Sequence, residues 1–112
     1  TIVFTASIQG IVAVANDAPY QAAKLGPLAL TRSLAMDYSP TIRVNSILPG
    51  PILTPAWNGV GSEDIHKVAE ETMLKRLGMP EEVAEVALFL ASDASSYMTG
   101  SSVIVDGGFT AK

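Results

Sequence analysis

The chain has 112 residues, of which 48% are hydrophobic, and it carries a formal net charge of −4 with no cysteine. Its length predicts one domain with enough apolar residues for a core, and its acidic balance argues against nucleic acid or an anionic membrane as partner. The lack of cysteine excludes a disulfide framework, a thiolate nucleophile and a cysteine-based metal site, so we predict no metal and expect a reducing, cytoplasmic location.

The first predicted element is a strand over residues 1–6, an unbroken apolar run that we expect to be buried on both faces. Ser7 follows at the carboxyl end of this strand. A loop over 8–17 then leads to a helix predicted over about 18–38, in which Pro27 is expected to cause a bend. This order of strand, serine, loop and helix predicts that the Ser7 hydroxyl faces the start of the helix.

Tyr20 and Lys24 are four residues apart in this helix, so they share one face about one turn apart. A phenol has an ordinary pKa of about 10, and a neighbouring ammonium lowers it towards the range in which the phenol exchanges protons with a substrate. Ser7 could hydrogen-bond the same substrate oxygen. The alternative interpretation is an ordinary half-exposed pair of side chains on a helix.

A second apolar run, rich in β-forming residues, predicts a buried strand over about 42–48. A strand, a helix and a strand joined by short loops imply a right-handed crossover and a parallel sheet. Ligands of such sheets bind beyond the carboxyl ends of the strands. Both Ser7 and the turn at Pro49 and Gly50 lie at such ends, which predicts a ligand crevice there.

The remainder of the chain predicts a helix over about 63–75 capped by Ser62, a helix over about 80–92, and a last strand over about 102–105. His66, the only histidine, lies among charged residues and is interpreted as a solvated helix residue. The apolar stripe of the first of these two helices predicts a core or lid face, made of Ile65, Val68, Ala69, Thr72 and Met73. The apolar stripe of the second helix predicts a buried face, made of Val83, Val86, Ala87 and Leu90.

The spacing of Ser7, Tyr20 and Lys24 is similar to that of the catalytic residues of the short-chain dehydrogenase/reductase family. Later segments resemble that family in the same order, at 42–54 with a Pro-Gly-x-x-x-Thr loop, at 76–84 and at 100–108. The resemblance implies an α/β fold, namely the C-terminal half of a Rossmann-like doubly wound parallel sheet with about three strands and flanking helices. Residues 1–112 would then be a single partial domain.

This resemblance also implies an activity, the interconversion of a secondary alcohol and a ketone by hydride transfer with NAD or NADP. Tyr20 would be the general acid/base. Lys24 would lower its pKa and hold the nicotinamide ribose, and Ser7 would steady the substrate oxygen. The substrate would be a small molecule.

The turn after the second strand would bracket the nicotinamide ring, since Pro49 is rigid and Gly50 is free to adopt a positive φ. By the same resemblance, the backbone of Ile52 and the hydroxyl of Thr54 would hold the carboxamide. A plain turn at the end of a strand is the alternative.

Substrate contacts are expected from Gln9, two residues after Ser7, and from Trp57, in the region that covers the substrate in the family. The alternatives are a solvated loop amide for Gln9 and simple packing for Trp57. In the family the helix over 18–38 packs against its copy in a second subunit, so we expect a homodimer or homotetramer.

The sequence lacks the glycine-rich phosphate loop of the family, so the N-terminal cofactor-binding half is absent from it. An alternative function is therefore a non-catalytic fragment or assembly module, inactive without that half. A serine hydrolase built on Ser7 and His66 is rejected, because no Gly-x-Ser-x-Gly elbow surrounds the serine.

Overall fold

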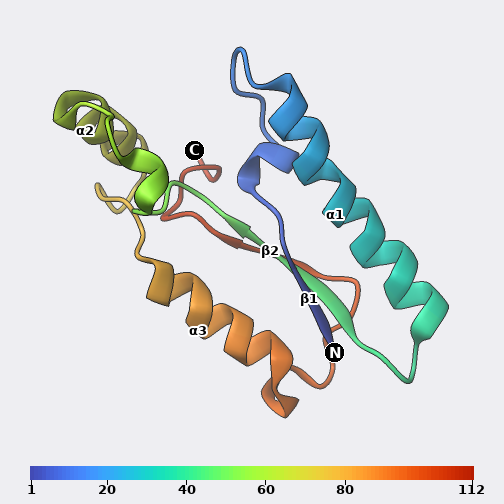
Figure 1. Ribbon diagram of the computed structural model, residues 1–112. Coiled ribbons are helices and arrows are strands. Elements are labelled where there is room, and N and C mark those ends of the chain that lie inside the picture. Colours follow the sequence, from blue (N-terminus) through green and yellow to red (C-terminus); the bar gives the residue numbers. More distant parts are fainter.

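Three parallel strands form the centre of the computed structural model, which describes residues 1–112 (Figure 1). In order across the sheet they are β1 (Ile2–Thr5), β2 (Val44–Pro49) and β3 (Ser102–Val105). The register places Phe4 beside Ser46, and Ser46 beside Ser102. Figure 1 shows the long helix α1 (Ala18–Tyr38) on one face of this sheet and α3 (Pro80–Ala91) on the other. The predicted parallel α/β fold with flanking helices is confirmed.

The short helix α2 (Ser62–Glu71) differs from its prediction at both ends. Ser62 is the first helical residue and not the cap. The cap is Gly61, whose backbone is extended and whose carbonyl accepts from the N–H groups of Asp64 and Ile65. The helix ends early because the Thr72 hydroxyl donates to the Ala69 carbonyl and so competes with the helical hydrogen-bond pattern.

The central strand β2 forms the core of the unit. Val44, Ile47 and Leu48 are at most 1% exposed, since β2 has a neighbour on each side and helices over both faces. The expectation of a doubly buried first strand is wrong: β1 is half-buried and its last residue, Thr5, is exposed. An apolar run of this length does not distinguish a central strand from an edge strand.

The helix stripes are buried nearly as predicted. In α3 the stripe of Val83, Val86 and Ala87 is half-buried and Leu90 is fully buried. The exception is Met73, which is 55% exposed because it follows the end of α2, where the helical period no longer applies. None of the helices combines the length and the apolar character that crossing a bilayer requires.

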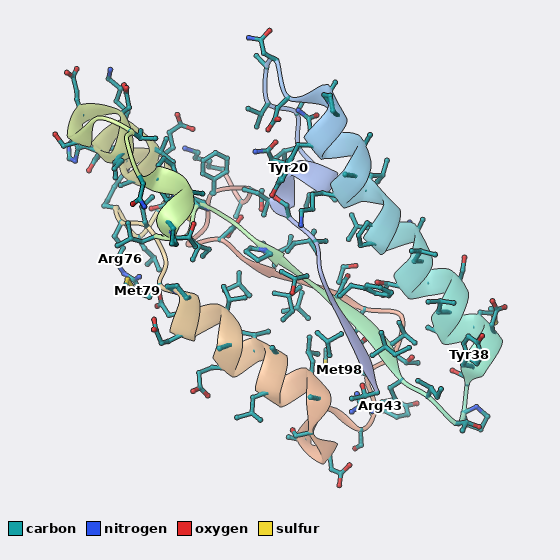
Figure 2. All side chains as sticks on the ribbon, in the orientation of Figure 1. Tyr20, Tyr38, Arg43, Arg76, Met79 and Met98 are labelled. Atoms are coloured by element: carbon teal, nitrogen blue, oxygen red, sulfur yellow. The ribbon has the colours of Figure 1, made fainter.

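Polar side chains fasten the amino end of β2 to the chain that follows α3. The guanidinium of Arg43 donates to the carbonyls of Leu90, Ser92 and Met98 at 2.9 to 3.2 Å. Figure 2 shows Arg43 and Met98 close together at this end of the sheet. Asn45, fully buried beside them, donates to the Met98 carbonyl at 2.9 Å. These contacts fix where the last strand begins relative to β2.

Candidate active site

Tyr20 and Lys24 lie side by side on the first turns of α1. The Lys24 ammonium nitrogen is 5.6 Å from the centroid of the Tyr20 ring, and it also donates to the Thr5 carbonyl at 3.4 Å. Tyr20 is 42% exposed and its hydroxyl makes no hydrogen bond within the chain. Figure 2 shows its side chain at the end of the sheet where β1 leads into the loop before α1. The phenol hydroxyl is thus open to a ligand, and a positive charge lies beside its ring.

Ser7 follows β1 directly and is 8% exposed. Its backbone is extended, and its hydroxyl oxygen accepts from the Gln9 N–H at 3.1 Å, which caps the short helix η1 (Ile8–Gly10). The hydroxyl hydrogen has no acceptor in the chain, so it remains free to donate to a substrate oxygen.

Gly10 brings η1 against α1. A Cβ atom built at this position would lie 3.0 Å from both the Lys24 carbonyl oxygen and a terminal methyl of Leu28. The backbone of η1 therefore approaches α1 closely only because this residue is glycine. This packing places the serine loop beside the turn of α1 that carries Tyr20 and Lys24.

Gln9 carries the only buried side-chain oxygen or nitrogen without a hydrogen-bond partner, its Oε1. The side chain borders an open hollow of about 220 Å³ between η1 and α1, whose other lining residues include Gln21 and Leu25. A buried amide oxygen without a donor is costly, so a ligand or water that donates to it would be favoured.

The turn after β2 is held against the residue that follows β3. Gly50 donates to the Val105 carbonyl at 2.9 Å, and a Cβ atom at Gly50 would lie 2.6 Å from the Cβ of Asp106. Glycine is therefore required here by close approach. The freedom of glycine to adopt a positive φ is not used here, because Gly50 is not among the residues with positive φ.

Asp106 is itself fixed by hydrogen bonds. Burial raises the pKa of its carboxyl, but hydrogen bonds from the Thr110 hydroxyl and from the N–H groups of Thr110, Gly108 and Phe109 outweigh this effect and hold the pKa below its ordinary value. The distances from Asp106 to the Thr110 hydroxyl and to the Gly108 nitrogen are 2.7 and 2.8 Å. The sequence indicated only a turn here, because a carboxylate that caps its own loop has no distinct spacing.

Ile52 presents an unpaired N–H group. The turn after β2 forms an isolated parallel β-bridge with Gly78, in which the neighbours of Ile52 make the hydrogen bonds. Leu53 donates to the Gly78 carbonyl at 2.8 Å, and Gly78 donates to the Pro51 carbonyl at 2.9 Å. The Ile52 carbonyl accepts from the Trp57 indole N–H at 2.7 Å, whereas its own N–H has no acceptor. Such a donor, on a half-buried residue beyond the end of β2, suits a ligand carbonyl oxygen.

Thr54 and Trp57 brace this turn. The Thr54 hydroxyl oxygen accepts from the Ala56 N–H at 3.4 Å and so caps the short helix η2 (Pro55–Trp57). Trp57 is half-buried and holds the Ile52 carbonyl through its indole. His66 is an exposed residue of α2.

Comparisons with known proteins agree on one kind of relative. A family model described as enoyl-(acyl carrier protein) reductase matches residues 1–110. The chain is 46% identical over 111 residues to cis-4-hydroxycyclohexanecarboxylate dehydrogenase of Sinomonas cyclohexanicum, and the match covers 98% of this chain and 45% of that protein. It is 44% identical over 117 residues to cyclohexanol dehydrogenase of Acinetobacter sp. (strain SE19), covering 99% and 43%.

The fold has the same kind of relative among solved structures. The ligand-free structure of aldohexose dehydrogenase from Thermoplasma acidophilum superposes with a TM-score of 0.93 at 35% identity, over 99% of this chain and 48% of that one. The chain thus spans slightly less than half the length of the proteins that it matches.

Proposed function

The chain belongs to the short-chain dehydrogenase/reductase family, and we propose that it supplies the catalytic residues of an NAD(P)-dependent oxidoreductase that interconverts a secondary alcohol and a ketone. The observation that carries the proposal is the placement of the Lys24 ammonium 5.6 Å from the Tyr20 ring centroid, beside the end of β1. This arrangement supports a role in proton transfer, which such a reaction needs.

Tyr20 accepts the proton of the alcohol hydroxyl as its phenolate while a hydride leaves the carbon, and it returns the proton when the ketone is reduced. Lys24 offsets the negative charge that the ring carries whenever Tyr20 has given up its proton. Ser7 donates its free hydroxyl hydrogen to the substrate oxygen and so holds that oxygen in line with Tyr20. The Tyr20 hydroxyl and the hydroxyl hydrogen of Ser7 have no hydrogen-bond partner within the chain, whereas the Lys24 ammonium is held by the Thr5 carbonyl.

The residues of the turn after β2 fit a nicotinamide. The unpaired Ile52 N–H suits the carboxamide oxygen, and the Thr54 hydroxyl lies two residues further along the same turn. NAD or NADP, when bound, accepts or supplies the hydride, and that chemistry belongs to the cofactor. Lys24 carries a positive charge beside Tyr20 and is proposed to hold the ribose as well.

The substrate is proposed to be a small secondary alcohol. Two relatives are named for the dehydrogenation of ring alcohols, so cyclohexanol and 4-hydroxycyclohexanecarboxylate are the first compounds to assay. Gln9, with its unpaired amide oxygen, is proposed to accept a hydrogen bond from such a substrate. Trp57 is proposed to form part of the pocket wall.

The deciding experiment is Tyr20→Phe in the whole protein, with Tyr38→Phe as the matched control. Figure 2 shows the two tyrosines at opposite ends of α1, and both are exposed. Oxidation of ring alcohols should fall by about 10²- to 10⁴-fold in Tyr20→Phe, which is the usual contribution of a general acid/base, and stay unchanged in Tyr38→Phe. Unchanged turnover in Tyr20→Phe rejects the role.

The alternative is that these 112 residues alone form only a folding or assembly module. This is favoured by the outer edge of β1, which has no strand beside it, and by the half-buried state of that strand. Titration of NADH fluorescence against the 112-residue chain distinguishes the two. Tight binding would contradict the module.

A homo-oligomer is proposed from the outer face of α1. Leu25, Leu30 and Met36 are 53%, 48% and 82% exposed there, beside the small residues Ala22 and Gly26. Apolar side chains on a helix that already packs one face on the sheet suit a second copy of that helix. Gel filtration of the whole protein at the mass of one subunit would contradict this.

A further inference from the structure

An ion pair closes the connection between α2 and α3. The two terminal nitrogens of Arg76 donate to the two carboxylate oxygens of Glu82 at 2.6 and 2.8 Å, which is a bidentate contact. The side chains are 50% and 43% exposed, so the pair lies at the surface. In Figure 2 the Arg76 label stands beside that of Met79, just before α3.

The same two side chains also form hydrogen bonds with the backbone on both sides of Gly78. Arg76 donates to the Leu77 carbonyl at 3.1 Å, and Glu82 accepts from the Met79 N–H at 2.7 Å. The hydrogen bonds from Arg76 and from Met79 lower the pKa of Glu82 to about 2, so the carboxylate stays charged at any pH at which the protein would work. The three residues from Leu77 to Met79 are thereby held in one shape.

Gly78, in the middle of this segment, is the β-bridge partner of the turn after β2. It accepts from Leu53 and donates to Pro51, and these two bonds leave the Ile52 N–H without a partner. The Ile52 side chain also packs closely against Gly78, because a Cβ atom built at Gly78 would lie only 2.6 Å from the Ile52 Cδ1 atom. A hollow of about 110 Å³ separates the ion pair from the turn and is lined by both.

We propose that Arg76 and Glu82 are positioning residues for cofactor binding, which hold Gly78 in place and so present the Ile52 N–H to the nicotinamide carboxamide. This inference rests on the proposed function. A role confined to capping α3 would involve Glu82 and Met79, but it would not require Arg76 to reach the Leu77 carbonyl. The hydrogen bond from Arg76 to the Leu77 carbonyl, next to Gly78, is the contact that indicates a role in positioning the turn after β2.

The test is Arg76→Met in the whole protein, with two readouts. In the cofactor-free protein, amide hydrogen exchange of Leu53 and Gly78 should quicken by roughly tenfold as the bridge opens locally, while Ile47 and Leu48 in β2 exchange as before. In the assay, KM for NAD or NADP should rise by about three- to tenfold with a smaller change in kcat. The first readout does not depend on activity.

Three further variants separate the possible causes. Arg76→Lys keeps the charge but cannot make the bidentate contact, so it should restore only part of the effect. Glu82→Gln keeps an acceptor for the Met79 N–H and loses the ion pair, so it should resemble Arg76→Met. Lys67→Met removes exposed contacts to Glu63 and Asp64 on α2 and should change neither readout.

The outcomes distinguish this inference from the function on which it rests. A wild-type protein that binds neither cofactor overturns the proposed function and the inference with it. Wild-type binding with an unchanged KM in Arg76→Met overturns the inference alone. Faster exchange at Ile47 and Leu48 to the same degree as at Gly78 also overturns it, because the pair would then only stabilise the whole fold.

Discussion

The Lys24 ammonium lies 5.6 Å from the centroid of the Tyr20 ring and donates to the Thr5 carbonyl at the end of β1. One side chain therefore links the proposed proton-transfer group to the sheet. The carbonyl limits where the ammonium can move, so the charge stays close to the ring. Separate effects on charge and on placement should follow from two substitutions at this position.

Lys24→Met should lower kcat by about 10²-fold, because it removes the positive charge beside the ring of the proposed proton-transfer group. Lys24→Arg should retain more activity than Lys24→Met, since it keeps the charge with a different shape. Steady-state kinetics with a saturating alcohol measure both, and circular dichroism checks that the fold is kept. Equal activity in the two variants would show that the charge is not what matters.

Gly10→Val should disrupt the site through packing. Its Cβ would start 3.0 Å from the Lys24 carbonyl oxygen, so η1 must move away from α1 and take Ser7 with it. We expect a loss of stability of about 1–3 kcal/mol, the usual cost of overpacking, and a drop in kcat of about tenfold or more. Urea unfolding and initial rates measure the two effects. Ala13→Val, at an exposed position in the same loop, serves as the control.

Much of the architecture follows from local patterns. The bounds of α1 were predicted correctly because Pro19 suits its first turn and because Pro27, inside the helix, was expected to bend the helix and not to end it. The bounds of β3 were also correct. In contrast, the burial of β1 was wrong, because exposure depends on how many strands stand beside it, which no run of six residues encodes.

The site was predictable only in part. Tyr20 and Lys24 share a helix face by spacing alone, and the structure places them together. The link between Arg76 and Glu82 was not predicted, because the chain turns sharply between them and their spacing matches no helix rule. Only the capping-box position of Glu82 could have indicated a role, and the cap residue there is Met79, which is not a usual one.

Asn45→Ala should destabilise the protein by about 2–4 kcal/mol, because it removes two buried hydrogen bonds. The Asn45 side chain donates to the Met98 carbonyl at 2.9 Å and accepts from the Ser101 N–H at 3.0 Å, and both groups would be left without these partners. Equilibrium unfolding in urea measures the change. Asn58→Ala, at an exposed loop position, should stay within about 0.5 kcal/mol of wild type.

Stability should also depend on pH through Glu82. Hydrogen bonds from Arg76 and Met79 lower the pKa of its carboxyl to about 2 in the folded chain, while the unfolded chain has the ordinary value of about 4.3. Because the folded pKa is the lower one, the stabilisation is fully present above pH 4.3 and is lost as the pH falls towards 2.

Urea unfolding of wild type and Glu82→Gln at a series of pH values isolates this carboxyl from the others, including Asp106, whose lowered pKa acts in the same direction. The amide of the variant cannot titrate, so the stability advantage of wild type should be constant from pH 7 to about 5 and shrink below it. An advantage that stays constant down to pH 2.5 would mean that Glu82 is not held as a carboxylate by Arg76. The placement of Gly78 against Ile52 would then need another cause.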